Sequence, residues 1–64
     1  MRFQIDDMSC AACVRSIEKA IAAVDGKAVV EADLGARQIR VQTGADKAQI
    51  MAALQEAGFP PKPL

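Results

Sequence analysis

The sequence predicts an α+β fold in which two helices cover one face of an antiparallel sheet. Three observations support this prediction: segments with strand-like alternation, two segments with apolar residues at helical spacing, and glycines where several of these segments end. In chain order the segments read β-α-β-β-α, and a short final strand would complete the ferredoxin-like βαββαβ arrangement. Because both helices must bury an apolar face, a two-layer sandwich is expected.

The first half of the chain predicts a strand followed by a helix. The strand is expected over residues 2–6, "RFQID", where polar and apolar residues alternate. The helix is expected over residues 11–24, with Ser9 as its N-cap and Gly26 as its stop. The predicted buried faces consist of Phe3 and Ile5 in the strand and Val14, Ile17, Ile21 and Val24 in the helix.

The middle of the chain predicts a β-hairpin. Residues 27–34 and 37–43 are the two expected strands, and Gly35 lies in the turn between them. The residues expected to face inward are Val30, Ala32, Leu34, Ile39 and Val41.

A second helix and a short last strand are expected after the hairpin. Asp46 and Gln49 fit a capping box that opens the helix, and Gly58 marks its end. Its predicted apolar stripe consists of Ile50, Ala53, Leu54 and Ala57. The tail "FPPKPL" holds three prolines, so the last strand is expected to be short and not a central one.

Length and composition limit the range of functions. Sixty-four residues predict one domain, 1–64, with a small core, because a chain of this size buries only about 60% of its unfolded surface. Eight basic and eight acidic residues leave no net charge, so a nucleic-acid partner is not expected. No apolar run approaches the ~20 residues that span a bilayer, which excludes membrane insertion by a helix. The N-terminus does not resemble a signal peptide, so a soluble cytoplasmic protein with reduced thiols is expected.

Cys10 and Cys13 are the only cysteines, and they stand at C-x-x-C spacing where the first helix is expected to begin. A disulfide between them would close a loop of only four residues, so it would contribute little to stability. The N-terminus of a helix stabilises thiolate, and two thiolates form a soft site that suits Cu(I). Structural zinc sites need four ligands, which would require oxygen ligands such as Asp6 or Asp7. A redox role is the other standard interpretation of this motif, and the spacing alone leaves both roles open.

The segment "DDMSCAAC" resembles the Met-x-Cys-x-x-Cys motif of heavy-metal-associated domains. This family includes small copper chaperones, N-terminal domains of heavy-metal P-type ATPases and mercury-binding proteins. "CVRSIEKAIAAVDG" is similar to the first helix of the family, "VVEADLGARQIRV" to its hairpin and "IMAALQEAGF" to its second helix. The resemblance therefore covers nearly the whole chain and implies the same βαββαβ fold.

The resemblance implies a role for five residues. Cys10 and Cys13 would bind the metal, expected to be Cu(I), with Zn(II) or Hg(II) as alternatives. Met8 would pack under the metal-binding loop, and Phe59 would lie in a loop beside the metal. Ser9 occupies a variable position of the motif where zinc-exporting relatives often have aspartate, so it favours copper. The chain departs from the family at Asp7, Lys27 and its shortened last strand.

The function that the resemblance implies is that of a copper chaperone. It would transfer Cu(I) by ligand exchange to the cytosolic domain of a heavy-metal P-type ATPase, and two copies could share copper as a metal-bridged homodimer. The alternatives are a thiol-disulfide redox protein, a metal-binding domain of such an ATPase, and a mercury-binding relative. No catalytic triad, phosphate-binding loop or pair of catalytic carboxylates can be assembled from the sequence, so an enzyme is not expected.

Overall fold

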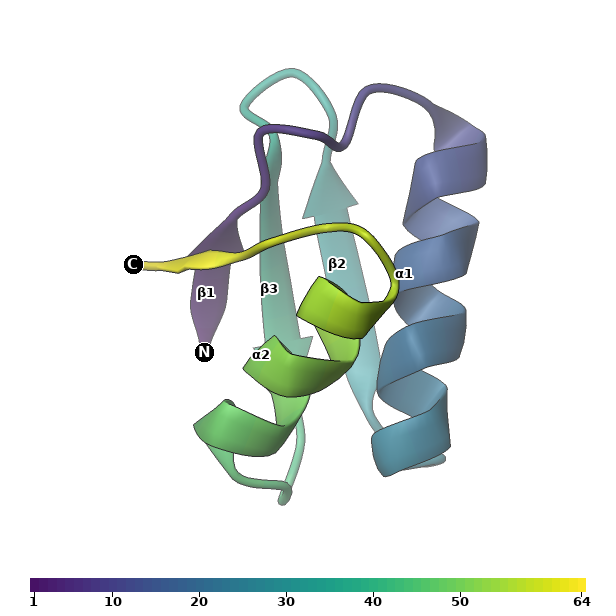
Figure 1. Ribbon diagram of the computed structural model, residues 1–64, viewed down its shortest axis with the longest axis vertical. Helices are drawn as coiled ribbons and strands as arrows, with labels where there is room; N and C mark the ends of the chain where they lie inside the picture. Colours follow the sequence, from purple (N-terminus) through teal and green to yellow (C-terminus); the bar gives the residue numbers. More distant parts are fainter.

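The computed structural model describes residues 1–64 and shows a four-stranded antiparallel sheet with two helices on one face (Figure 1). The elements in chain order are β1 (Arg2–Gln4), α1 (Ala11–Val24), β2 (Val29–Asp33), β3 (Gln38–Gln42), α2 (Lys47–Glu56) and β4 (Lys62–Pro63). The strand order across the sheet is β2-β3-β1-β4, and every neighbouring pair is antiparallel. The predicted ferredoxin-like βαββαβ sandwich is therefore confirmed. Neither helix is long and apolar enough to cross a lipid bilayer.

The core lies between the sheet and the two helices. Its nine buried residues are all apolar and consist of Phe3, Ile5, Met8, Ile17, Ile21, Ile39, Val41, Ile50 and Leu54. Every one of them except Met8 stands on a face that the sequence predicts to be buried. Met8 follows the first strand, and its complete burial fixes the loop that leads to the cysteines against the core.

Four residues predicted to face the core lie at the surface instead. Val24 and Ala57 stand at the ends of their helices, beyond the part of each helix that packs on the sheet. Ala32 belongs to the edge strand β2, and Leu34 lies in the turn after it. The spacing of apolar residues predicts the face of a helix or strand on which a side chain lies. Burial also requires that another element covers that part of the face.

The ends of the helices agree with the sequence in part. The Asp46–Gln49 capping box is present, and the Asp46 amide donates to Gln49 Oε1 at 3.2 Å. Gly58 follows the Ala57 cap of α2 with a φ of 91°, which glycine adopts at little cost. The prediction of Ser9 as the N-cap of α1 is wrong, because Cys10 occupies that position with an extended backbone. No side chain caps α1.

The turn of the hairpin also differs from expectation in one respect. It spans residues 34–37 and contains Gly35, as predicted, and Asp33 Oδ1 accepts the Ala36 amide at 3.1 Å. The left-handed conformation falls on Arg37, with a φ of 55°, and not on the glycine. This conformation is uncommon for a residue with a β-carbon and points to a constraint from neighbouring contacts.

The predicted short last strand is confirmed at the edge of the sheet. In β4, Lys62 pairs with Gln4 and Pro63 with Phe3, and the Leu64 amide donates to the Arg2 carbonyl at 3.0 Å. The strand has only two residues, as the prolines of the tail predict.

Asp25 joins two loops at the end of α1. The Thr43 hydroxyl donates to Asp25 Oδ2 at 2.6 Å, and the Lys27 amide donates to Asp25 Oδ1 at 3.0 Å. These donors, the Thr43 hydroxyl first, lower the pKa of the Asp25 carboxyl. The loop after α1 is thus fastened to the loop that precedes α2.

This contact predicts a pH dependence of stability. Because the pKa of Asp25 is lower in the folded state, its contribution is complete above the unfolded pKa of about 3.9 and is lost as the pH falls through the folded value. We expect the unfolding free energy of the wild type to fall more steeply between about pH 6 and pH 2 than that of Asp25→Asn. Urea denaturation at a series of pH values measures the unfolding free energy, with Glu18→Gln, which removes an exposed carboxylate on α1, as control. Equal slopes for wild type and Asp25→Asn would contradict the prediction.

Candidate metal centre

The loop between β1 and α1 carries the candidate site and is fixed at both ends. It begins with a β-turn in which the Met8 amide donates to the Ile5 carbonyl at 3.1 Å. The side chains of Ile5 and Met8 are both fully buried. At the other end the Cys10 carbonyl accepts the Cys13 amide at 3.0 Å, which starts α1. The position of the cysteines is therefore set by the core below and by the helix that follows.

The two thiols lie side by side at the surface. Cys10 is exposed, Cys13 is half-buried, and their Sγ atoms are 3.2 Å apart with one thiol donating to the other. A disulfide has an S–S distance of about 2.05 Å, so both cysteines are free here. A metal–thiolate bond is about 2.3 Å long, so one ion can contact both sulfurs at a separation up to about 4.6 Å. At 3.2 Å the two sulfurs lie within this limit, so one ion could contact both.

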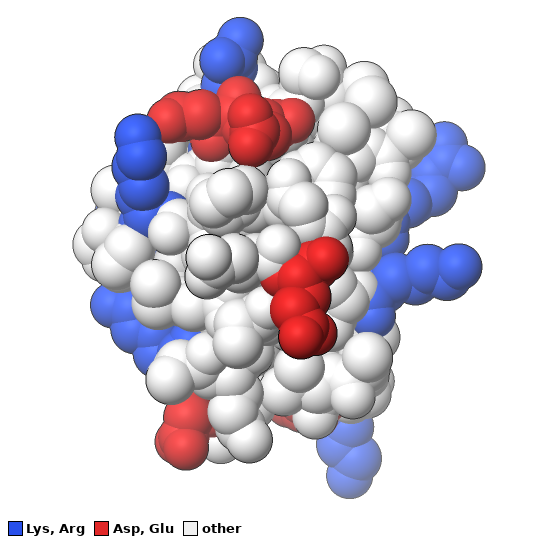
Figure 2. Space-filling model, viewed as in Figure 1, with Lys and Arg blue, Asp and Glu red and all other residues white.

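The surroundings of Cys13 favour its thiolate. A hydrogen bond from the Ser9 backbone is the main cause that lowers the pKa of the Cys13 thiol, and the Cys10 side chain adds to the effect. The sequence also predicts a stabilised thiolate, because it places the cysteines at the N-terminus of a helix. In the structure the main cause is instead a hydrogen bond from Ser9, which precedes the helix. Figure 2 shows acidic side chains gathered at the end of the molecule where this loop lies in Figure 1. Basic side chains lie beside them in Figure 2, and Lys62 pairs with Asp6, so their negative charge is partly compensated.

No third metal-binding side chain joins the two thiols. No cluster of three or more Cys, His, Asp or Glu residues with ligand geometry exists in the structure. Asp6, considered from the sequence as an oxygen ligand, instead binds Lys62 Nζ at 2.9 Å and Gln4 Nε2 at 3.2 Å. The hydrogen bond from Lys62 is also the main cause that lowers the pKa of Asp6. The site therefore offers two ligands, which suits an ion that accepts few.

The other residues expected to support the site lie at different depths. Met8 is fully buried, Ser9 is exposed, and Phe59 is half-buried against the core. Phe59 stands in the segment between α2 and β4, where its amide donates to the Leu54 carbonyl at 2.9 Å. The structure describes these positions, and the role of each in metal binding stays a prediction.

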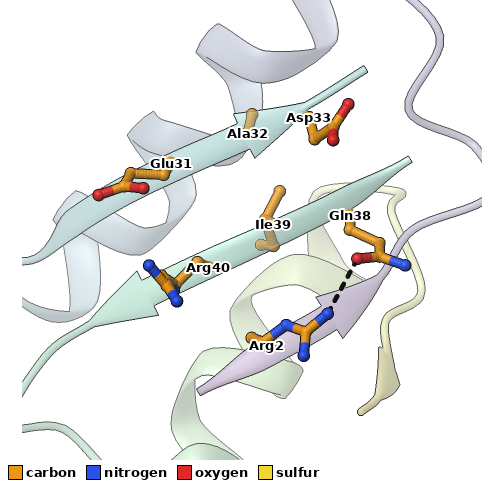
Figure 3. A pocket seen from close by; sticks show the side chains of 7 residues that line it. All are labelled: Arg2, Glu31, Ala32, Asp33, Gln38, Ile39 and Arg40. Carbon is orange, nitrogen blue, oxygen red and sulfur yellow. Dashed lines mark hydrogen bonds between the residues drawn. The ribbon is translucent and has the colours of Figure 1, made fainter. Parts of the chain in front are cut away.

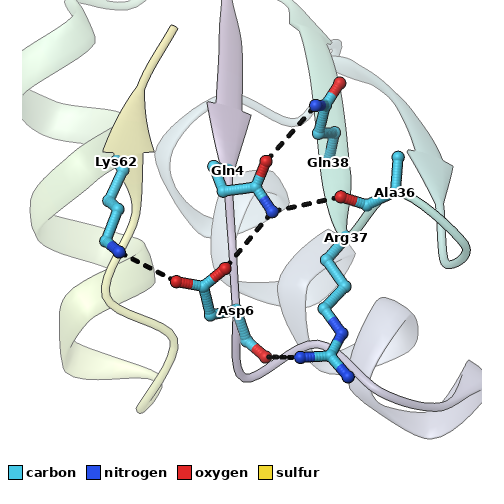
Figure 4. A network of polar contacts seen from close by, with 6 residues as sticks. All are labelled: Gln4, Asp6, Ala36, Arg37, Gln38 and Lys62. Atoms are coloured by element: carbon cyan, nitrogen blue, oxygen red, sulfur yellow. Dashed lines mark hydrogen bonds and ion pairs between the residues drawn. The ribbon is translucent and has the colours of Figure 1, made fainter.

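Two residues that contact the loop were missed by the sequence analysis. The Arg37 guanidinium donates to the Asp6 carbonyl at 3.3 Å, and Lys62 forms the ion pair with the Asp6 side chain (Figure 4). Both come from distant parts of the chain, and nothing in their local sequence marks them as neighbours of the loop. The register of the sheet is what brings them there.

The thiols lie outside the two surface pockets of the structure. One pocket of about 310 Å³ lies on the sheet and is lined by Arg2, Glu31, Ala32, Asp33, Gln38, Ile39 and Arg40 (Figure 3). The other, about 390 Å³, is lined by Arg15, Glu18, Lys19 and Ala22 on α1. Cys10 and Cys13 line neither pocket, and Cys10 is exposed on the open surface of the molecule.

The fold and the site together define a class of protein: a small ferredoxin-like domain that presents two free thiols on the loop after its first strand. The family model of the heavy-metal-associated domain matches residues 2–60, and the chain belongs to this family.

Comparisons with individual proteins agree with this assignment. The chain is 45% identical over 62 residues to copper-transporting ATPase 1 of Rhizobium meliloti, which covers 94% of this chain and 8% of the ATPase. It is 32% identical over 59 residues to the copper chaperone CopZ of Bacillus subtilis, which covers 88% and 86% of the two chains. A crystal structure of a gold binding protein superimposes with a TM-score of 0.92 at 45% identity, over 97% of this chain and 95% of the other. The chain thus spans less than a tenth of the ATPase and most of the chaperone.

Proposed function

We propose that the chain carries one Cu(I) ion on the thiolates of Cys10 and Cys13. The observation behind the proposal is the pair of free thiols 3.2 Å apart at the surface, with no third ligand beside them. Thiolates select soft ions, and Cu(I) is stable with few ligands. Relatives described as a copper chaperone and a copper-transporting ATPase support the choice of copper, whereas Zn(II) and Hg(II) are the alternatives.

The open site suits transfer by ligand exchange. A thiolate of the partner attacks the bound Cu(I) and forms a third Cu–S bond, and one of the two bonds to this chain then breaks. A second partner thiolate then binds the ion, and the remaining bond to this chain breaks. Each step exchanges one thiolate for another, so the charge and the oxidation state of the ion do not change. Because Cys10 is exposed at the end of the helix, the third thiolate can enter without unfolding any element. The chain would act as a carrier and not as an enzyme.

The proposed partner is a cytosolic domain of a heavy-metal P-type ATPase with its own cysteine pair. The similarity to copper-transporting ATPases supports it, because a carrier and an acceptor with like sites exchange ions without a large difference in affinity. A cytoplasmic place of action belongs to the same proposal, since free thiols persist in a reducing compartment. Met8 would support the loop from below, Ser9 would favour copper over zinc, and Phe59 would border the site.

One observation favours a second candidate function. The 45% identity is to a short part of a copper-transporting ATPase, so the chain could serve as a metal-binding domain within such a transporter. The thiols and the ion would be the same, but the exchange would occur between parts of one protein. A transfer assay with the isolated partner domain gives the same result whether the chain is a separate carrier or a domain of the transporter.

The proposal predicts the result of an anaerobic titration. The reduced protein is titrated with Cu(I) against a competing chelator, and Zn(II) is titrated in parallel. We expect one equivalent of Cu(I), bound more tightly than zinc, and loss of copper to an ATPase domain mixed with the loaded protein. Weak copper binding together with a readily formed and reduced disulfide would contradict the proposal and favour the redox function.

A further inference from the structure

The turn that precedes the cysteines has a central peptide that can take two orientations. Ile5, Asp6, Asp7 and Met8 form the turn, closed by the 3.1 Å bond from the Met8 amide to the Ile5 carbonyl. Turns of types I and II differ in the orientation of the peptide between the second and third residues. The Asp6 carbonyl belongs to that peptide. Turns of both types carry the chain along nearly the same path, so a bond to this carbonyl tethers the middle of the turn and does not redirect the chain.

Arg37 contacts two successive residues of this turn. Its carbonyl accepts the Ile5 amide at 2.7 Å, and its guanidinium donates to the Asp6 carbonyl at 3.3 Å (Figure 4). The second bond holds the central peptide with its oxygen towards the hairpin turn. Arg37 is also the one residue other than glycine with a positive φ, 55°. In this backbone conformation the carbonyl of Arg37 contacts Ile5 and its side chain contacts Asp6.

Gln4 and Lys62 bind the side chain of Asp6, whereas Arg37 binds its backbone carbonyl. Gln4 Nε2 donates to both Asp6 Oδ1, at 3.2 Å, and the Ala36 carbonyl, at 3.1 Å. Lys62 Nζ contacts Asp6 Oδ2 at 2.9 Å (Figure 4). These bonds and the bond from Arg37 to the Asp6 carbonyl are all exposed, so each contributes little to stability by itself. Arg37 alone contacts the peptide that decides the type of the turn.

Asp7 opposes the alternative orientation from within the turn. A type II turn needs a positive φ at its third residue, which is Asp7, and Asp7 does not have one. The conformation of Asp7 and the bond from Arg37 therefore favour the same orientation of the peptide.

We propose that Arg37 is a positioning residue of the metal centre: its bonds to Ile5 and Asp6 tether the turn that leads to Cys10 and thereby limit the movement of Cys10 relative to Cys13. This inference rests on the proposed function for its effect on copper, but its structural part can be tested without metal. Residues that orient the ligands of a metal typically contribute 10–100-fold to affinity. For Arg37, which acts on the loop and not on a ligand, an effect of about 10-fold is expected.

The test compares Arg37→Gly, Arg37→Lys and the charge control Arg40→Ala. Glycine adopts a φ of 55° without strain, which stabilises the folded state of Arg37→Gly. Glycine also gives the unfolded chain more freedom, which offsets this gain, so the stability is expected to stay close to that of the wild type. Lysine restores a donor at the same position. Arg40 stands on β3, the strand that follows Arg37, and makes no hydrogen bond to the loop, and Arg40→Ala removes the same charge. Two quantities are measured: Cu(I) affinity by chelator competition, and hydrogen exchange of the Met8 amide in the metal-free protein.

We expect Arg37→Gly to bind Cu(I) about 10-fold more weakly and to exchange the Met8 amide faster, at an unchanged urea midpoint, with Arg37→Lys closer to the wild type. A parallel loss of affinity and of urea midpoint would show a merely structural role and overturn the inference. Unchanged affinity and Met8 exchange, relative to Arg40→Ala, would also overturn it. If the wild type does not bind Cu(I), the proposed function fails, and the exchange of the Met8 amide alone decides whether Arg37 fixes the turn.

Discussion

Replacing Cys10 or Cys13 with serine is expected to weaken Cu(I) binding by more than about 100-fold, because even residues that merely orient a ligand contribute 10–100-fold. A serine hydroxyl is a hard ligand that stays protonated at neutral pH, so each variant would keep one thiolate for a soft ion. No other Cys, His, Asp or Glu stands close enough to replace the lost sulfur. The result would assign the binding to the two thiols together.

The same substitutions are expected to leave the fold intact. Cys10 is exposed and Cys13 is only partly buried, and neither forms a disulfide whose loss would matter. Competition with a Cu(I) chelator measures affinity, and circular dichroism on heating measures the fold. Ala22→Ser, which adds a hydroxyl on the exposed side of α1, serves as the control. One equivalent of copper bound by Cys10→Ser with wild-type affinity would disprove the assignment of the ligands.

Shortening Met8 to alanine is expected to cost about 2–5 kcal/mol of unfolding free energy, because the side chain is completely buried. A domain of this size has a total stability of only about 3–10 kcal/mol, so the variant would lose a large part of it. Met51 is half-buried on α2, and Met51→Ala is expected to cost less. Urea denaturation of both variants measures the difference.

Met8→Leu separates packing from metal binding. Leucine has nearly the same volume, so the substitution is expected to cost less than about 1.5 kcal/mol. If Met8 acts through packing, the variant keeps its Cu(I) affinity, since no sulfur ligand has been removed. A clear loss of copper affinity in Met8→Leu, at a stability near that of the wild type, would identify Met8 as a ligand and contradict its proposed supporting role.

The parts of the fold that follow from local periodicity could be predicted from the sequence. Phe3 and Ile5, at strand spacing, and Ile17 and Ile21, at helical spacing, are all buried as expected. The failures in predicting which residues are buried have one physical origin. Val24 has the correct spacing but stands where the helix leaves the sheet, and spacing carries no information on what covers a face.

The candidate site could be predicted to a similar extent. Two cysteines three residues apart at the start of a helix must lie close together, and the 3.2 Å between their sulfurs agrees with this. The contacts that hold the loop could not be predicted, since Arg37 and Asp6 are 31 residues apart and Lys62 and Asp6 are 56 apart. Such contacts depend on strand register and on turn geometry, which the sequence pattern leaves undetermined.

The two-residue strand β4 has a consequence for how copies of the molecule can meet. It forms one edge of the sheet, where a longer strand would offer a row of free amides to a neighbouring chain. Pro60, Pro61 and Pro63 have no amide hydrogen to offer, so this edge cannot extend into a shared sheet. The opposite edge, β2, carries Glu31 and Asp33, whose charges oppose pairing with a second copy of the same strand. Neither edge of the sheet therefore favours the addition of a strand from a second copy of the chain.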